Sequence, residues 1–206
     1  MFAGFDGSCR TNDFFAYDTE TSTWTSVGAT NAAGAAPSPR HSHAAVIYGS
    51  SMFVFGGYDG SYRNDFHEFD FEASCWTQVA PAGQVPKARY RASSVVAGKK
   101  MVLFGGHDGS RHLNDLHVFA FELRAWSQLQ ADGPPPIPRD SHVAVVHSDQ
   151  MYIFGGSTGA AMNDFYSLHM EQCTWRQVKT QASSCPAQRF CHVACVHENA
   201  MFIFGT

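Results

Sequence analysis

The sequence lacks long apolar runs and a basic leader, and both absences bear on membranes. No uninterrupted apolar segment approaches the roughly 18 residues that a membrane-spanning helix needs. The first ten residues, MFAGFDGSCR, do not combine a basic start with a long apolar stretch, as a secretory signal would. We therefore expect no membrane partner.

Clustered positive charge and paired cysteines are missing too. The 14 Lys and Arg residues are scattered and the formal net charge is −4, so the chain lacks the basic patch of a nucleic-acid-binding protein. The six cysteines show no CxxC pair and no shared register, and several fall in predicted strands. This usage favours reduced thiols over a disulfide framework. We expect an intracellular protein, cytoplasmic or nuclear, that does not bind nucleic acid.

What the sequence does contain is an internal repeat. The segment MFVFGG at Met52 returns as MVLFGG at Met101, MYIFGG at Met151 and MFIFGT at Met201, at spacings of 49, 50 and 50 residues. We call each set of equivalent residues a column. Three further columns keep this step: Trp24, Trp76, Trp126 and Trp175; Arg40, Arg89, Arg139 and Arg189; Asn12, Asn64, Asn114 and Asn163. So many aligned columns establish a repeat of about 50 residues.

Each repeat contains four short apolar or alternating segments separated by turn residues, which indicates strands rather than helices. We label these strands A to D. In one full repeat they are predicted at 92–97, 101–105, 115–121 and 125–129. The segment HDGSRHLN connects B to C, and its Asp-Gly pair supplies residues that tolerate a positive φ in the turn.

A four-stranded repeat of this length, with a double glycine after strand B and a Trp on strand D, resembles the kelch repeat, the blade of a β-propeller. The resemblance covers the whole chain. It implies an all-β fold of about four repeats of four-stranded antiparallel blades, three complete and two partial: 1–28 (partial), 43–79, 92–129, 141–178 and 191–206 (partial).

The resemblance also implies that these blades belong to a larger ring of six. The alternative is a closed four-bladed ring, in which the strand at 191–196 completes the first blade. Exposed edges of incomplete blades would favour self-association through strand pairing.

Several columns are predicted to be architectural. Phe55, Phe104, Phe154 and Phe204 on strand B, with the four Trp on strand D, are expected to fill the space between neighbouring sheets. The double glycines are expected where a side chain would collide with a neighbouring backbone. The repeated Arg is expected to tie loops together, and His43, His142 and His192 to have a structural role at the start of strand A.

The sequence does not favour a catalytic site or a metal site. Cys191 and Cys195 lie about 13 Å apart on an extended strand, too far to share one zinc ion. In the run Asp140-Ser141-His142, adjacent strand residues point to opposite faces and cannot form a hydrolase relay. We expect no catalytic residues, no metal, no cofactor and no enzymatic activity.

Recognition of a protein client is the favoured function. The D-to-A and B-to-C loops lie on the same rim of a blade and are longer than the turns on the other rim, so binding residues are expected there. Tyr and Arg often dominate protein interfaces. The predicted partner-binding residues on this rim are Tyr58, Tyr62, Arg63, Tyr90, Arg91, His107, Arg111, His112 and Phe190.

The stretch HSHAAVIYGSSMFVFGGYDGSYRND and the loop DGPPPIPRDSH resemble the kelch region of leucine-zipper-like transcriptional regulator proteins and related multi-kelch scaffolds. This resemblance implies client recruitment, within a ubiquitin ligase adaptor or scaffold. Arg91 matches a position where kelch adaptors often contact acidic peptides, although the other repeats carry Ser42, Ser141 and Cys191. Alternatives are an actin or cytoskeletal binder and, less favoured, a propeller enzyme.

Overall fold

The computed structural model describes residues 1–27, 34–180 and 185–205, and all regular elements within them are β-strands. No helix in these ranges is long and apolar enough to cross a membrane. The chain divides into two compact units. The first comprises Met1–Ala80 and Lys87–Tyr90, and the second Pro81–Pro86 and Arg91–Thr206.

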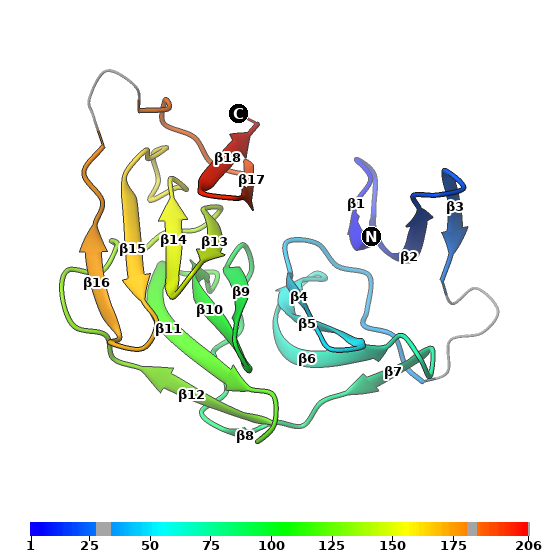
Figure 1. Cartoon of the computed structure of the whole chain (residues 1–206). Coiled ribbons are helices and arrows are strands. Elements are labelled where there is room, and N and C mark those ends of the chain that lie inside the picture. The colour runs from blue at the N-terminus through cyan, green and yellow to red at the C-terminus, as the bar shows by residue number, and fades with distance from the viewer. Residues whose placement is uncertain (28–33, 181–184, 206) are drawn as a thin grey trace. The chain divides into compact units, whose positions relative to one another are not determined.

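The first unit holds two antiparallel sheets in chain order (Figure 1). The three-stranded sheet consists of β1 (Phe2–Phe5), β2 (Arg10–Asp18) and β3 (Thr23–Ser26). The four-stranded sheet consists of β4 (Ala44–Tyr48), β5 (Ser51–Tyr58), β6 (Tyr62–Asp70) and β7 (Cys75–Gln78), which are strands A to D of a complete blade.

The second unit holds three sheets. The first is β9 (Ser93–Ala97), β10 (Lys100–His107), β11 (His112–Ala120) and β12 (Ala125–Leu129), with the short β8 (Ala82–Gly83) added in parallel to β12. The second is β13 (Val143–His147), β14 (Gln150–Phe154), β15 (Phe165–His169) and β16 (Thr174–Gln177). The third is β17 (Val193–His197) paired with β18 (Ala200–Phe204).

These sheets confirm the all-β fold of four-stranded antiparallel blades. Two details of the strand prediction were wrong. Strand β8 was not predicted, because a two-residue strand has no periodicity to detect. The B-to-C connection is also shorter than predicted, since after a bulge at Phe104/Gly106 pairing resumes and continues to His107 opposite His112. The six-bladed ring and the closed four-bladed alternative both stay predictions.

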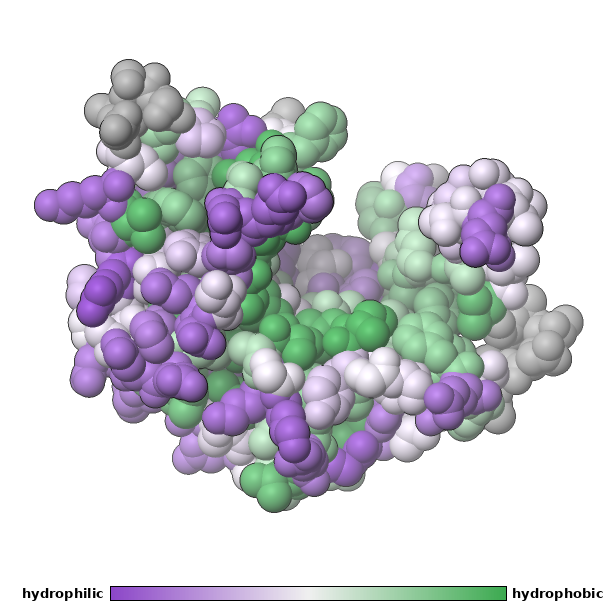
Figure 2. All heavy atoms as spheres, in the orientation of Figure 1, coloured by the Kyte–Doolittle hydropathy of each residue, from purple (hydrophilic) through white to green (hydrophobic). Residues whose placement is uncertain are grey.

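The Phe and Trp columns pack between neighbouring blades, as predicted. The Phe2 ring lies 4.8 Å from the Trp76 ring in the first unit, and the Phe104 ring lies 5.2 Å from the Trp175 ring in the second. Beside Trp175, the outward-facing Arg176 is exposed, and Figure 2 shows hydrophilic side chains over this edge of the unit. On β16, the adjacent residues Trp175 and Arg176 therefore point to opposite faces, one buried and one exposed.

Two members of these columns depart from the prediction. Trp24 is 58% exposed and Phe204 is 81% exposed, whereas Phe104 is fully buried. Trp24 lies on β3, at the end of the three-stranded sheet, and Phe204 lies on β18 in a sheet of only two strands. A large side chain in these columns is buried only where another sheet covers it, so position in the repeat alone does not decide burial.

The double glycine marks a close approach of two backbones, as predicted. At Gly155, a Cβ atom would lie 2.8 Å from the carbonyl oxygen of Arg189 and 3.1 Å from that of Met162. Gly155 also has a φ of +64°, which L-residues with a side chain rarely adopt. This contact brings the D-to-A loop against the end of strand B.

Candidate interaction surface

A repeated set of polar contacts holds the D-to-A loop onto the B-to-C loop in one complete blade of each unit; we call the edge made by these loops the loop rim. In the second unit, buried Arg139 donates through Nη1 to the Gly155 carbonyl at 2.9 Å and pairs with both carboxylate oxygens of Asp164 at 2.6 and 2.7 Å. Arg40 makes the same contacts with Gly56 and Asp65 in the first unit. The loop-tying role predicted for these arginines is confirmed.

The Asn column adds further bonds between these loops. We call the contacts of the repeated Arg and Asn side chains the frame of the loop rim. Asn12 donates to the Pro37 carbonyl in the first unit, and Asn114 donates to the Pro136 carbonyl in the second, both at 3.2 Å. Side-chain to backbone bonds of this kind satisfy loop carbonyls that no strand partner reaches. The loop rim is therefore a fixed support for the side chains that it carries.

One column of the loop rim has a left-handed backbone in every repeat. Ser42, Arg91, Ser141 and Cys191 have φ values of 57°, 54°, 56° and 56°. Such a conformation is uncommon for residues other than glycine and persists only where surrounding contacts enforce it. Here the Ser141 amide donates to the Arg91 carbonyl, and the Cys191 amide donates to the Ser141 carbonyl, both at 3.0 Å. The direction of the Arg91 side chain is thus set by the frame.

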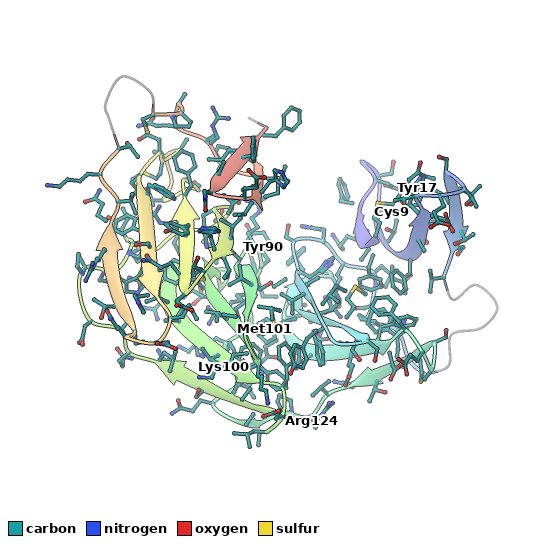
Figure 3. All side chains as sticks on the ribbon, viewed as in Figure 1. Cys9, Tyr17, Tyr90, Lys100, Met101 and Arg124 are labelled. Atoms are coloured by element: carbon teal, nitrogen blue, oxygen red, sulfur yellow. The ribbon has the colours of Figure 1, made fainter. Side chains whose placement is uncertain are left out.

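The loop rim of the first unit carries a cluster of tyrosines. The Tyr58 and Tyr62 ring centroids lie 5.2 Å apart, and Tyr62 and Tyr90 lie 5.3 Å apart, both edge to face. All three are partly exposed, and Figure 3 labels Tyr90. Arg63, on β6 beside Tyr62, is 46% exposed and donates through Nε to Asp59 at 2.7 Å. The structure therefore brings together four of the predicted binding residues.

The loop rim of the second unit carries charged and imidazole groups instead. The buried Asp140 carboxylate accepts from Ser141 Oγ at 2.6 Å and lies 3.3 Å from His112 Nε2 and 4.0 Å from Arg91 Nη1. The His107 ring lies edge to face with His112 at 4.9 Å. Asp140, which sequence analysis did not assign to the site, is the residue that gathers the predicted Arg91 and His112.

Two predicted residues of the second unit stand apart from this cluster. Arg111 is 69% exposed, and its Nε lies 3.8 Å from Asp108 in the turn that follows β10. Phe190 is 47% exposed. A large exposed ring and an exposed guanidinium are both available to a partner.

Arg10 was not among the predicted binding residues, although its place in the repeat marks it as one. Arg10 pairs with Phe5 across the turn, as Tyr62 pairs with Tyr58 and His112 with His107, so it occupies the column of two predicted residues. Its guanidinium lies over the Tyr58 ring, 5.3 Å from the centroid. Counting back from the Asn column would have found it.

The catalytic and metal candidates are arranged as structural groups. Ser141 donates to Asp140, whereas His142 bonds through Nε2 to Ser93 Oγ at 2.7 Å, so the three adjacent residues form no relay. Burial lowers the pKa of His142 to about 3 and that of His43 to about 4, helped by the nearby repeated arginine in each case. Across residues 1–27, 34–180 and 185–205, no three His, Cys, Asp or Glu side chains gather as a metal site.

The fold and its repeated inter-blade contacts define the chain as a set of β-propeller blades. A model of the KLHDC2/KLHL20/DRC7 Kelch-repeats domain matches residues 1–206. The chain therefore belongs to this family of kelch-repeat domains.

Individual relatives are similar over shorter stretches. The chain is 35% identical over 86 residues to the leucine-zipper-like transcriptional regulator 1 homolog of Drosophila melanogaster, covering 38% of this chain and 8% of the relative. It is 31% identical over 77 residues to human Kelch domain-containing protein 3, covering 36% of this chain and 19% of the relative. The matched part is thus less than a fifth of each relative.

Proposed function

We propose that this chain is a protein-interaction module that recruits a client protein through its D-to-A and B-to-C loops. The observation that carries the proposal is a contrast within the loop rim. The Arg, Asn and Gly residues that fix its backbone repeat, while the partly exposed side chains mounted on it change from tyrosine to histidine and arginine. Binding surfaces on rigid scaffolds are built in this way.

We also propose that the client is delivered to a ubiquitin ligase, as the resemblance to multi-kelch scaffold proteins implies, and that the chain has no enzymatic activity. Absence of enzymatic activity is supported by the separation of Ser141 from His142, which bonds to Ser93 instead. Fold membership alone implies neither role.

The proposal is tested by affinity-capture mass spectrometry on the chain and on an Arg91→Ala, Arg111→Ala double variant. The control is Lys99→Ala, which removes one exposed positive charge where the double variant removes two, and which lies in the A-to-B turn on the other rim of the same blade. We expect the double variant to lose a captured protein that the control retains, with direct binding of that purified protein checked afterwards. Equal capture by all three chains would place the site elsewhere, and the absence of any specific protein would contradict the proposal.

A further inference from the structure

A pocket of about 400 Å³ opens on the loop rim of the first unit, beside the tyrosine cluster. Phe5, Ser8, Cys9 and Arg10 line it from the turn between β1 and β2, Ser38–Pro39 from the D-to-A loop, and Asp59 from the turn after β5. Figure 3 labels Cys9 in the β1–β2 turn. This volume falls within the usual range of ligand pockets.

Arg10 differs from the predicted arginines of the loop rim. Arg63, Arg91 and Arg111 each have a carboxylate of this chain within ion-pair distance. Among the residues that the structure describes, the Arg10 guanidinium carbon lies over the Tyr58 ring, 5.3 Å from its centroid, and no carboxylate is within ion-pair distance of this arginine. The N–H groups of a guanidinium are the part of arginine that binds a carboxylate.

The other charged groups of the pocket are already satisfied. Asp59 accepts from Ser38 Oγ at 2.6 Å and from Arg63 Nε at 2.7 Å. Asp6, beside the pocket, accepts from the Ser8 and Cys9 amides at 2.7 and 2.8 Å. Its hydrogen bond to the Cys9 thiol raises the pKa of that thiol and so disfavours the thiolate.

We propose that this pocket binds an internal client segment in which an Asp or Glu side chain lies beside an apolar side chain. The carboxylate pairs with Arg10, and the apolar group covers Phe5, which is 57% exposed, together with Pro39. This inference rests on the proposed function and names the chemistry of the client.

The pocket favours a single side-chain carboxylate over other anions. A chain terminus is usually held by several backbone N–H groups, but those of Ser8 and Cys9 already serve Asp6. A phosphate carries nearly two negative charges, and the second would face the Asp59 carboxylate in the same pocket. The Arg10 guanidinium beside the Phe5 ring therefore matches a ligand with one negative charge next to an apolar group.

The test uses random 12-residue segments displayed between fixed flanks, so that no segment has a free terminus, selected on the chain. We expect the enriched segments to contain Asp or Glu next to an apolar residue. A synthetic enriched peptide, acetylated and amidated, is then titrated by fluorescence anisotropy. Its dissociation constant should rise at least tenfold with Arg10→Ala, and equally when its acidic residue is changed to the amide.

Two further variants make the result interpretable. Arg10→Gln removes the charge but keeps the chain length over Tyr58, so it should lose binding while retaining the melting temperature. Arg176→Ala removes an exposed arginine of β16 and should leave the affinity unchanged. Enriched segments without acidic residues, an empty selection, tight binding by Arg10→Gln, or a requirement for a free peptide carboxyl terminus would each overturn the inference. Client capture that depends on Arg91 and Arg111 but not on Arg10 would overturn it while leaving the proposed function intact.

Discussion

The loop rims of the two units share the contacts of a repeated arginine but differ in the side chains that they expose. In the first unit, three tyrosine rings pack against one another and Arg10 lies over one of them. In the second, the buried Asp140 collects a histidine, an arginine and a serine. Arg40 and Arg139 make matching contacts beneath both. The comparison teaches that the frame carries stability, so the residues above it are free to vary with the partner.

The largest effect is expected from breaking that frame. Arg139→Ala leaves Asp164 without its bidentate partner and the Gly155 carbonyl without its buried donor. Removing one member of a buried ion pair costs about 3–5 kcal/mol of unfolding free energy. Chemical denaturation should show this loss, with a matching loss for Arg40→Ala in the first unit. Arg189→Ala is the control, because Arg189 is more exposed and donates to the Gly205 carbonyl without a described carboxylate partner. Equal costs for Arg139 and Arg189 would argue against the ion pair as the source.

The close approach at the double glycine can be separated from backbone strain. Gly155→Ala adds a Cβ against the Arg189 carbonyl at a φ of +64°, whereas Gly159→Ala adds one at +100° with nothing within 4 Å. We expect about 2–4 kcal/mol of destabilisation at Gly155 and about 1–2 kcal/mol at Gly159. Thermal unfolding of the two variants measures the difference. If Gly159→Ala is the more damaging, the backbone contact is not the constraint.

Acid should weaken both units, through the partly buried His43 in the first and the buried His142 in the second. The pKa of His142 is about 3 and that of His43 about 4 in the folded chain, while an unfolded histidine titrates near 6.5. The unfolded state therefore binds protons first as the pH falls. Stability is fully present above pH ~6.5 and declines toward pH ~4, by at most about 1.4 kcal/mol per pH unit for each histidine. His142→Gln, which can keep the bond to Ser93, should flatten part of this decline in denaturation curves. An unchanged slope would mean that other groups cause it.

The smallest effect on stability is expected on the loop rim itself. Arg111 is 69% exposed and lies 3.8 Å from Asp108, so Arg111→Ala should change the unfolding free energy by less than about 0.5 kcal/mol. The melting temperature checks this, next to the client-capture experiment. A large loss of stability would assign Arg111 to the frame and remove it from the candidate binding residues.

The sequence by itself determined the architecture, because each packing position of a kelch blade recurs about 50 residues later and needs the same type of residue there. The strand patterns, the arginine that ties loops together and the glycine that meets a neighbouring backbone were all legible from the columns. Residues that hold the fold recur, and recurrence within one chain can be seen without any other sequence.

Only the tertiary structure decided what surrounds each side chain. Trp24 and Phe204 share columns with buried residues yet are exposed, since burial depends on the sheet that covers them. Asp140 lies within ion-pair distance of Arg91 and His112, which come from separate loops. Arg10 of one blade lies over the Tyr58 ring of the next. A contact that is made only once leaves no periodic trace, because at least one of the residues that make it changes from repeat to repeat.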